Sequence, residues 1–143
     1  MTNPPVSSRA SFRDKKSRKP VPIPANKPLI EPKLLEMVRL RVAQICHSKS
    51  CMEVHTKALK AHRESPERIQ QLVAWQGNSL YSDREQAALA ISEALSSDLP
   101  KTLPANVVHQ AQAHLSDPEI VHLTLAILAV IDWNYPHAEE RHS

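Results

Sequence analysis

Residues 33–62 read KLLEMVRLRVAQICHSKSCMEVHTKALKAH, which is the pattern of a helix, a break and a second helix. Apolar side chains recur every three or four residues in the first half, and this spacing predicts a helix over about 33–46. The break falls at His47-Ser48. Serine is a preferred N-cap, so Ser48 is expected to start a second helix that runs to about His62. A helical hairpin therefore lies at the centre of the predicted fold.

The rest of the chain favours helices as well. Its 143 residues include one glycine and 3% aromatic side chains, too few for a sheet protein with many tight turns. Alanine, leucine, glutamate and glutamine, which favour helices, are common. Capping signals predict four further helices, over about 65–76, 82–95, 105–114 and 116–133. We therefore predict an all-α fold of about six helices in one domain.

The first 29 residues differ from the rest in composition. They hold six prolines, seven lysines or arginines and one aspartate, with few apolar side chains. Such a segment cannot offset its ordering entropy by burial, so residues 1–29 are predicted to be a disordered basic tail and 30–143 the helical domain. The basic cluster over 13–19 could contact nucleic acid or an anionic surface. No aromatic side chain lies among those charges to stack on bases, so a nucleic-acid partner is not expected.

The same tail bears on the compartment. No apolar segment follows its basic residues, as a secretory signal would require. We therefore expect a cytoplasmic protein that does not enter a membrane, whose two cysteines, Cys46 and Cys51, remain reduced thiols.

The last predicted helix is apolar on nearly every face between Ile120 and Trp133. This stretch is shorter than the roughly 20 residues that span a bilayer. A helix apolar all round must be buried on all sides, which in so small a domain favours burial by other subunits. A homo-oligomer is therefore predicted, with a central core helix of a monomer as the alternative.

Three side chains of the hairpin have the chemistry of a reactive-cysteine site. Cys51 and His55 are four residues apart and share a helix face, and Glu36 lies one helix upstream. Cys51 falls in the first turn of its helix, where the partial positive charge of the N-terminus favours the thiolate. Each residue alone has a structural explanation: a buried small thiol, a hydrogen-bonded core histidine and a solvated carboxylate.

Several segments carry a resemblance to a known family. They are Leu35–Ile45, Cys51-x3-His55-Thr56-Lys57, Leu72–Trp75, Tyr81–Ala90, Val121–Ile127 and Trp133-Asn134. Together they resemble the carboxymuconolactone decarboxylase family, and within it the AhpD-like peroxidase branch, over about residues 30–135. The resemblance implies a fold built on a helical hairpin and assembly as homotrimers or homohexamers.

The branch motif is a glutamate, eleven residues and then Cys-x-x-Cys-x-x-x-His. The resemblance implies that Cys51 is the attacking thiolate, His55 its base and Glu36 a carboxylate that relays protons. It also implies an antioxidant oxidoreductase that acts on a peroxide or disulfide and takes electrons from an external thiol or a thioredoxin-like protein, and we expect no cofactor. Ser48 stands where the motif has its resolving cysteine, so Cys46 is a candidate replacement in a Cys-x4-Cys pair.

Other readings remain open at this point. The site could act with one cysteine, forming a sulfenate that an external thiol resolves. The chain could belong with the decarboxylases or other non-redox relatives, although Cys51 would then lack a chemical role. It could be a catalytically idle helical oligomer that serves as a binding module. Finally, Cys46, His47, Cys51 and His55 could supply four zinc ligands.

Overall fold

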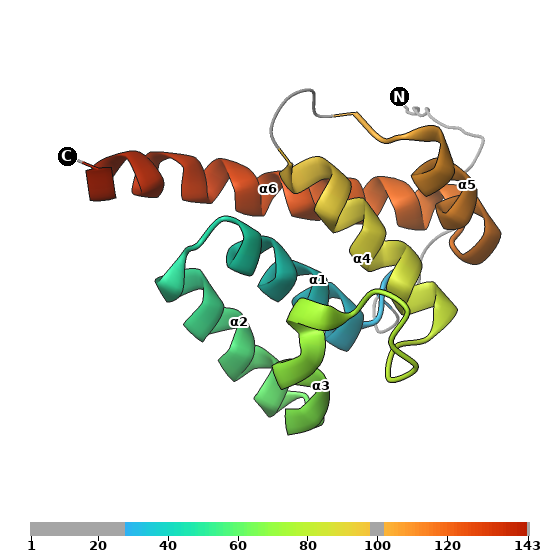
Figure 1. Cartoon of the computed structure of the whole chain (residues 1–143), viewed down its shortest axis with the longest axis horizontal. Helices are drawn as coiled ribbons and strands as arrows, with labels where there is room; N and C mark the ends of the chain where they lie inside the picture. The colour runs from blue at the N-terminus through green and yellow to red at the C-terminus, as the bar shows by residue number, and fades with distance from the viewer. Residues whose placement is uncertain (1–27, 98–101, 143) are drawn as a thin grey trace, which may run out of the picture.

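The computed structural model describes residues 28–97 and 102–142, with side chains as far as Asn134, and both stretches are helical without a strand (Figure 1). The all-α prediction of six α-helices is confirmed. The elements are α1 (Pro32–Ile45), α2 (Lys49–Ala61), α3 (Pro66–Gln70), the 3-10 helix η2 (Gln71–Ala74), α4 (Asp83–Ser96), α5 (Ala105–His114) and α6 (Asp117–His142). Most of the tail predicted over 1–29, including its basic cluster, lies outside the described residues.

Serine side chains start four of these helices, as the sequence predicts, and the Ser116 hydroxyl at the start of α6 accepts the backbone N–H of Glu119. The Ser48 hydroxyl accepts the backbone N–H of Cys51, and Ser65 caps α3 in the same manner. Ser82 and Glu85 form a reciprocal capping box at the start of α4. Each cap satisfies backbone donors that the first turn leaves without partners.

The third predicted helix differs from the structure. Instead of one helix over 65–76, the short α3 tightens into η2. In a 3-10 helix, residues three apart lie on the same line of the surface. Leu72 and Trp75, three apart, are 0% and 4% exposed, so the tighter turn directs both side chains into the core. The indole N–H of Trp75 donates to Glu93 of α4 at 3.0 Å.

The same backbone turn ends α1 and α2, and it therefore lies at both ends of α2. After α1, the N–H of His47 donates to the carbonyl of Gln44 and the N–H of Ser48 to the carbonyl of Ala43, at 3.1 and 3.0 Å. This pattern is a Schellman motif, and His47 takes its left-handed position with φ of 57°. Arg63 occupies the equivalent position after α2 with φ of 64°. The hairpin angle between α1 and α2 is thus set by local backbone hydrogen bonds.

Helix α1 lies at the centre and packs against α2, α4 and α6, while α4 also packs on α5 and α6. These helices enclose one core whose largest fully buried side chains are Ile30, Met37, Leu40, Leu59, Leu72, Leu89, Ile91, Leu123 and Ile127. No helix of the described part of the chain is both long and apolar enough to cross a membrane.

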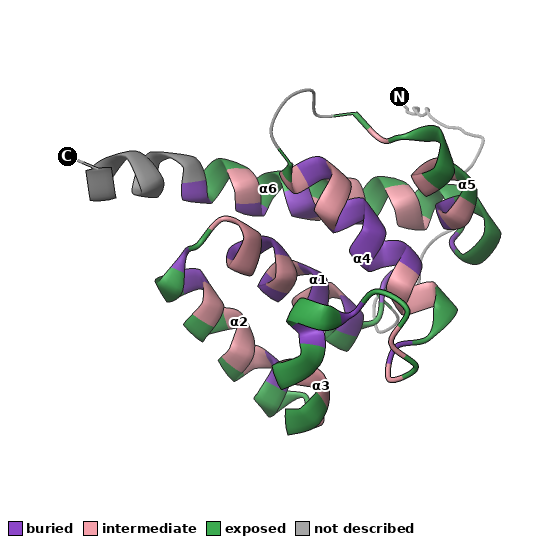
Figure 2. Cartoon of the chain, viewed as in Figure 1, coloured by how far each residue is buried: buried purple, intermediate pink, exposed green. Residues whose placement is uncertain are grey.

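As far as Asn134, helix α6 is buried on one face only (Figure 2). Leu123 and Ile127 are 0% exposed, whereas Leu125 and Trp133 are 63% and 59% exposed. The alternative of a core helix enclosed within a monomer is therefore wrong for this chain. The apolar residues on the outer face of α6 are left in contact with solvent.

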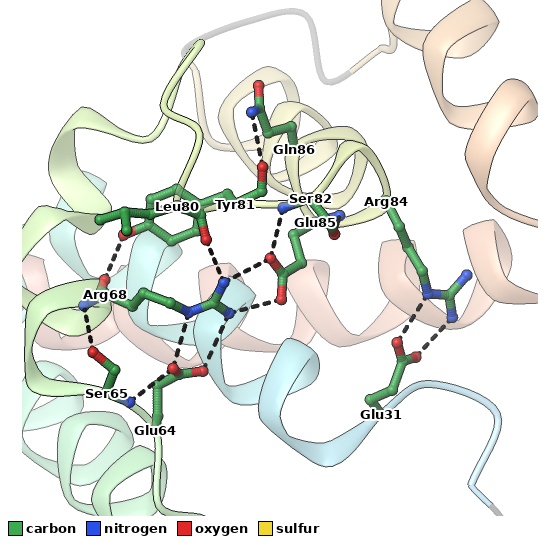
Figure 3. Close-up of polar contacts among 10 residues, drawn as sticks. All are labelled: Glu31, Glu64, Ser65, Arg68, Leu80, Tyr81, Ser82, Arg84, Glu85 and Gln86. Atoms are coloured by element: carbon green, nitrogen blue, oxygen red, sulfur yellow. Dashed lines mark hydrogen bonds and ion pairs between the residues drawn. The ribbon is translucent and has the colours of Figure 1, made fainter.

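Two arginines tie elements together through paired carboxylates (Figure 3). Arg68 bonds both Glu64 and Glu85, and Arg84 bonds both Glu31 and Glu119. The hydrogen bond from Arg84 lowers the pKa of Glu119 to about 2. Through Arg84, the starts of α1 and α6 are fastened to α4.

Candidate thiol site

A carboxylate–imidazole pair joins the two arms of the hairpin. Glu36 of α1 and His55 of α2 lie 2.8 Å apart between Oε1 and Nδ1. The other carboxylate oxygen accepts a hydrogen bond from Arg39, one turn along α1, at 2.9 Å. The side chains of Glu36 and His55 are 17% and 15% exposed, so water competes little for the contact. The structure thus brings together two of the predicted site residues.

The third predicted residue, Cys51, lies in the first turn of α2 and is 7% exposed. Its backbone N–H donates to Ser48 at 3.4 Å. Its thiol donates to Oδ1 of Asn134, in α6, at 3.1 Å. Asn134 is 2% exposed and was not among the predicted site residues. The sequence placed it inside a matching segment but carried no signal that linked it to a cysteine 83 residues earlier.

Cys51 and His55 line one cavity. It has a volume of about 340 Å³ and is lined by Arg39, Cys51, Val54, His55, Ala126, Ala129, Val130 and Trp133. Cys51 and His55 therefore open onto the same space, between α2 and the partly exposed side of α6. Most of the lining is aliphatic or aromatic, and Arg39 is its one permanently charged side chain.

Cys46 is at the end of α1 and does not line this cavity. It is the C-cap residue and is partly buried against the core. Neither Cys46 nor Cys51 forms a disulfide in the structure. The hydrogen bond of the Cys51 thiol goes to Asn134 rather than to Cys46.

The structure contradicts the zinc alternative. Within the described residues, no three histidine, cysteine, aspartate or glutamate side chains are grouped as metal ligands would be. Cys46, His47, Cys51 and His55 all belong to that described part.

A buried thiol at a helix N-terminus, on one cavity with an imidazole held by a carboxylate, defines a candidate reactive-cysteine site on an all-helical fold. The model of the carboxymuconolactone decarboxylase family matches residues 25–94, which include α1, α2 and most of α4. The chain belongs to this family, as the resemblance predicted.

The chain is also similar to two relatives and to a solved structure. The chain is 31% identical to the uncharacterized protein YdfG of Bacillus subtilis over 99 residues, which are 69% of this chain and 67% of that protein. It is 26% identical to the uncharacterized protein YnjA of Escherichia coli over 68% of its own length and 53% of that relative.

The fold is similar to the crystal structure of a protein of unknown function from Agrobacterium tumefaciens. That protein carries the provisional description of an antioxidant defence protein AhpD. The TM-score is 0.73 at 26% sequence identity, over 80% of this chain and 78% of the other. The structural similarity covers more of the chain than the family match, which ends at residue 94.

Proposed function

We propose that the protein is a thiol-dependent peroxidase in which Cys51 is the nucleophile. The observation that carries this proposal is that Cys51 and His55 line one cavity while Glu36 holds the imidazole from behind. A nucleophile, a base and a carboxylate that orients the base together form the arrangement that activates a cysteine for attack. Membership of a family that includes peroxidases supports the same assignment.

His55 is suited to move the thiol proton. Its Nδ1 is engaged by Glu36, and among the described residues its Nε2 has no hydrogen bond. A carboxylate on Nδ1 fixes the tautomer in which Nδ1 carries the proton and Nε2 accepts one. Glu36 then stabilises the imidazolium that forms when His55 takes the proton of Cys51.

The reaction balances without a cofactor. The thiolate of Cys51 attacks one oxygen of R–O–O–H, so an S–O bond forms and the O–O bond breaks. The sulfur loses two electrons and becomes a sulfenic acid, while the leaving alkoxide takes the proton held by His55 and departs as ROH. An external thiol then condenses with the sulfenic acid and releases water, and a second thiol releases Cys51 and leaves as a disulfide.

Ser48 favours the external thiol in this scheme because a hydroxyl cannot form the disulfide of a Cys-x-x-Cys pair. The same substitution favours a second candidate function, a catalytically idle oligomer that binds a partner. Cys46 is the alternative resolving group, and it would release water by attacking the sulfenic acid of Cys51. Turnover and trapping experiments separate the three possibilities.

Cys51→Ser is expected to reduce the consumption of cumene hydroperoxide, measured with dithiothreitol as reductant, to the rate of buffer. A hydroxyl cannot be oxidised to the sulfenic acid on which the cycle depends. Cys46→Ser is the matched control, and its activity should stay within about twofold of the unsubstituted protein if an external thiol resolves Cys51.

Dimedone followed by mass spectrometry reports the intermediate in the same samples. We expect a dimedone adduct on Cys51 in the Cys46→Ser protein. A Cys46–Cys51 disulfide in the unsubstituted protein would instead assign the resolving role to Cys46. An unsubstituted protein no faster than buffer would exclude the peroxidase and leave the binding module.

The outer face of α6 supports a homo-oligomer, trimeric or hexameric, as the form in which this site works. Val121, Leu125, Leu128 and Trp133 of α6 and Val54 of α2 are large apolar side chains that are 38% to 63% exposed. Patches of this kind on soluble proteins commonly mark interfaces. Light scattering should give three or six times the 16.0 kDa chain mass. A monomer at micromolar concentration would refute the assembly.

A further inference from the structure

Among the described residues, the sulfur of Cys51 has a single hydrogen bond, and its partner is not one of the predicted catalytic residues. The thiol donates to Oδ1 of Asn134 at 3.1 Å across the contact between α2 and α6. Both residues are buried, at 7% and 2% exposure. A buried hydrogen bond of this kind affects the chemistry of its donor because water does not replace it readily.

The carboxamide of Asn134 cannot turn freely about this contact. Its Nδ2 donates to the backbone carbonyl of Val130, one turn earlier in α6, at 2.9 Å. Rotating the carboxamide to bring its NH2 group to the sulfur would direct Oδ1 at that carbonyl, and two acceptors would then face each other. The helix backbone therefore determines that an acceptor, and not a donor, meets Cys51.

We propose that Asn134 holds Cys51 as a protonated thiol in the resting site and thereby restrains its reactivity. This inference rests on the proposed function, since it concerns the sulfur that would attack the peroxide. A carbonyl oxygen accepts a hydrogen bond from S–H but has none to give to S⁻, so the contact favours the neutral form. The thiolate is the nucleophile, and a held thiol is correspondingly slow to react.

His55 as a base and Arg39 as a cation favour the thiolate and so oppose Asn134. His55 lies on the same helix as Cys51, and Glu36 and Arg39 are on α1, which packs against it. To the cavity that Cys51, His55 and Arg39 line, α6 contributes only uncharged side chains, namely Ala126, Ala129, Val130 and Trp133. Ionisation of Cys51 thus transfers the proton from its sulfur to His55, with the loss of the hydrogen bond to Oδ1 of Asn134. The protonation of Cys51 depends on the competition between these two acceptors.

The restraint has a chemical benefit in a site that has serine at position 48. A thiolate with no adjacent resolving cysteine is exposed to further oxidation once it forms a sulfenic acid. Holding the resting group as S–H reduces the time that Cys51 spends in the reactive form. Asn134 thus belongs to the site and regulates the reactivity of Cys51.

Asn134→Leu, made in a Cys46→Ser background, tests the proposal through the rate of Cys51 alkylation by iodoacetamide at pH 5 to 10. Leucine keeps a similar volume but has no acceptor. We expect the half-maximal rate to move to lower pH and the rate at pH 7 to rise about 3–10-fold, the size expected for one neutral hydrogen bond. Asn106→Leu on α5 is the matched control and should leave the profile unchanged.

Two outcomes would overturn the proposal. In the first, the plateau rate changes at high pH while the midpoint stays in place, which is the result of altered access alone. In the second, the S–H stretching band of the folded Cys46→Ser protein lies at the higher frequency of a model thiol in a dilute apolar solvent, which would mean that the thiol has no acceptor. The vibrational measurement needs no variant at position 134, so it decides even if Asn134→Leu fails to fold. Neither measurement requires turnover, so a failed peroxidase assay would leave both interpretable.

Discussion

Arg68→Met is expected to lower the free energy of unfolding by about 3 kcal/mol, the lower end of the range for removing one partner of a buried ion pair. Arg68 bonds Glu64 at 2.9 Å and Glu85 at 2.7 Å, and the two carboxylates come from either side of it (Figure 3). Burial alone would raise the pKa of Glu85, but the hydrogen bond from Arg68 brings it below its ordinary value. Methionine fills much of the space and leaves two carboxylates facing each other without a cation.

The interactions of Arg68 extend beyond these two acids. Its guanidinium also donates to the carbonyl of Leu80 and lies 5.2 Å from the centre of the Tyr81 ring. The Tyr81 hydroxyl in turn donates to the carbonyl of Arg68. One side chain thus joins α3, the loop before α4 and the first turn of α4, so its loss should loosen all three.

Urea denaturation measures the change, with Lys57→Met on the exposed side of α2 as the matched control. We expect the control to change stability by less than about 0.5 kcal/mol, as surface substitutions usually do. Adding Glu64→Gln to Arg68→Met should recover part of the loss, because it removes one of the facing charges. A loss under about 1 kcal/mol for Arg68→Met would show that the pair behaves like a solvated surface contact.

Ser48→Cys is expected to convert the site into one with its own resolving thiol. The Ser48 side chain lies against the first turn of α2, since its hydroxyl accepts the N–H of Cys51. A thiol placed there completes a Cys-x-x-Cys sequence at a helix N-terminus, a known setting for redox-active pairs. A thiol tethered this closely acts at an effective concentration of about 1 mM or more, well above a micromolar external thiol.

Peroxide treatment followed by mass spectrometry should therefore show a disulfide between positions 48 and 51, with dimedone labelling of Cys51 reduced by about tenfold or more. Ser48→Ala is the control. It loses the cap, at a cost of about 1 kcal/mol, but adds no thiol. Its labelling should match that of the unsubstituted protein. Undiminished labelling of Cys51 in Ser48→Cys would mean that the two sulfurs cannot approach within bonding distance.

The features that the sequence predicted well are local ones. The break between α1 and α2 and the serine caps depend on residues within four positions of each other, so the capping rules identify them. The Glu36–His55 contact was also expected, because the hairpin brings consecutive helices side by side. The tightening of α3 into η2 was missed, since it depends on the core that receives Leu72 and Trp75.

The contacts that the sequence could not predict join distant elements. The Cys51–Asn134 hydrogen bond depends on how α6 crosses α2, and Arg68 meets Glu85 only because α3 lies against the start of α4. No spacing rule reports such an approach. The buried face of α6 could not be predicted for a related reason. Its sequence is apolar nearly all round, and only the packed chain shows which face is covered.

The left-handed corners of α2 bear on how far this protein can change. A residue other than glycine in that conformation costs roughly 1–2 kcal/mol, and His47 and Arg63 both adopt it, while the one glycine of the chain, Gly77, lies elsewhere. Arg63→Gly would remove this strain at the C-terminal end of α2, away from Cys51. This one substitution is therefore expected to raise the free energy of unfolding. A change such as Ser48→Cys, which weakens a cap but adds chemistry, could be tolerated once that substitution is in place.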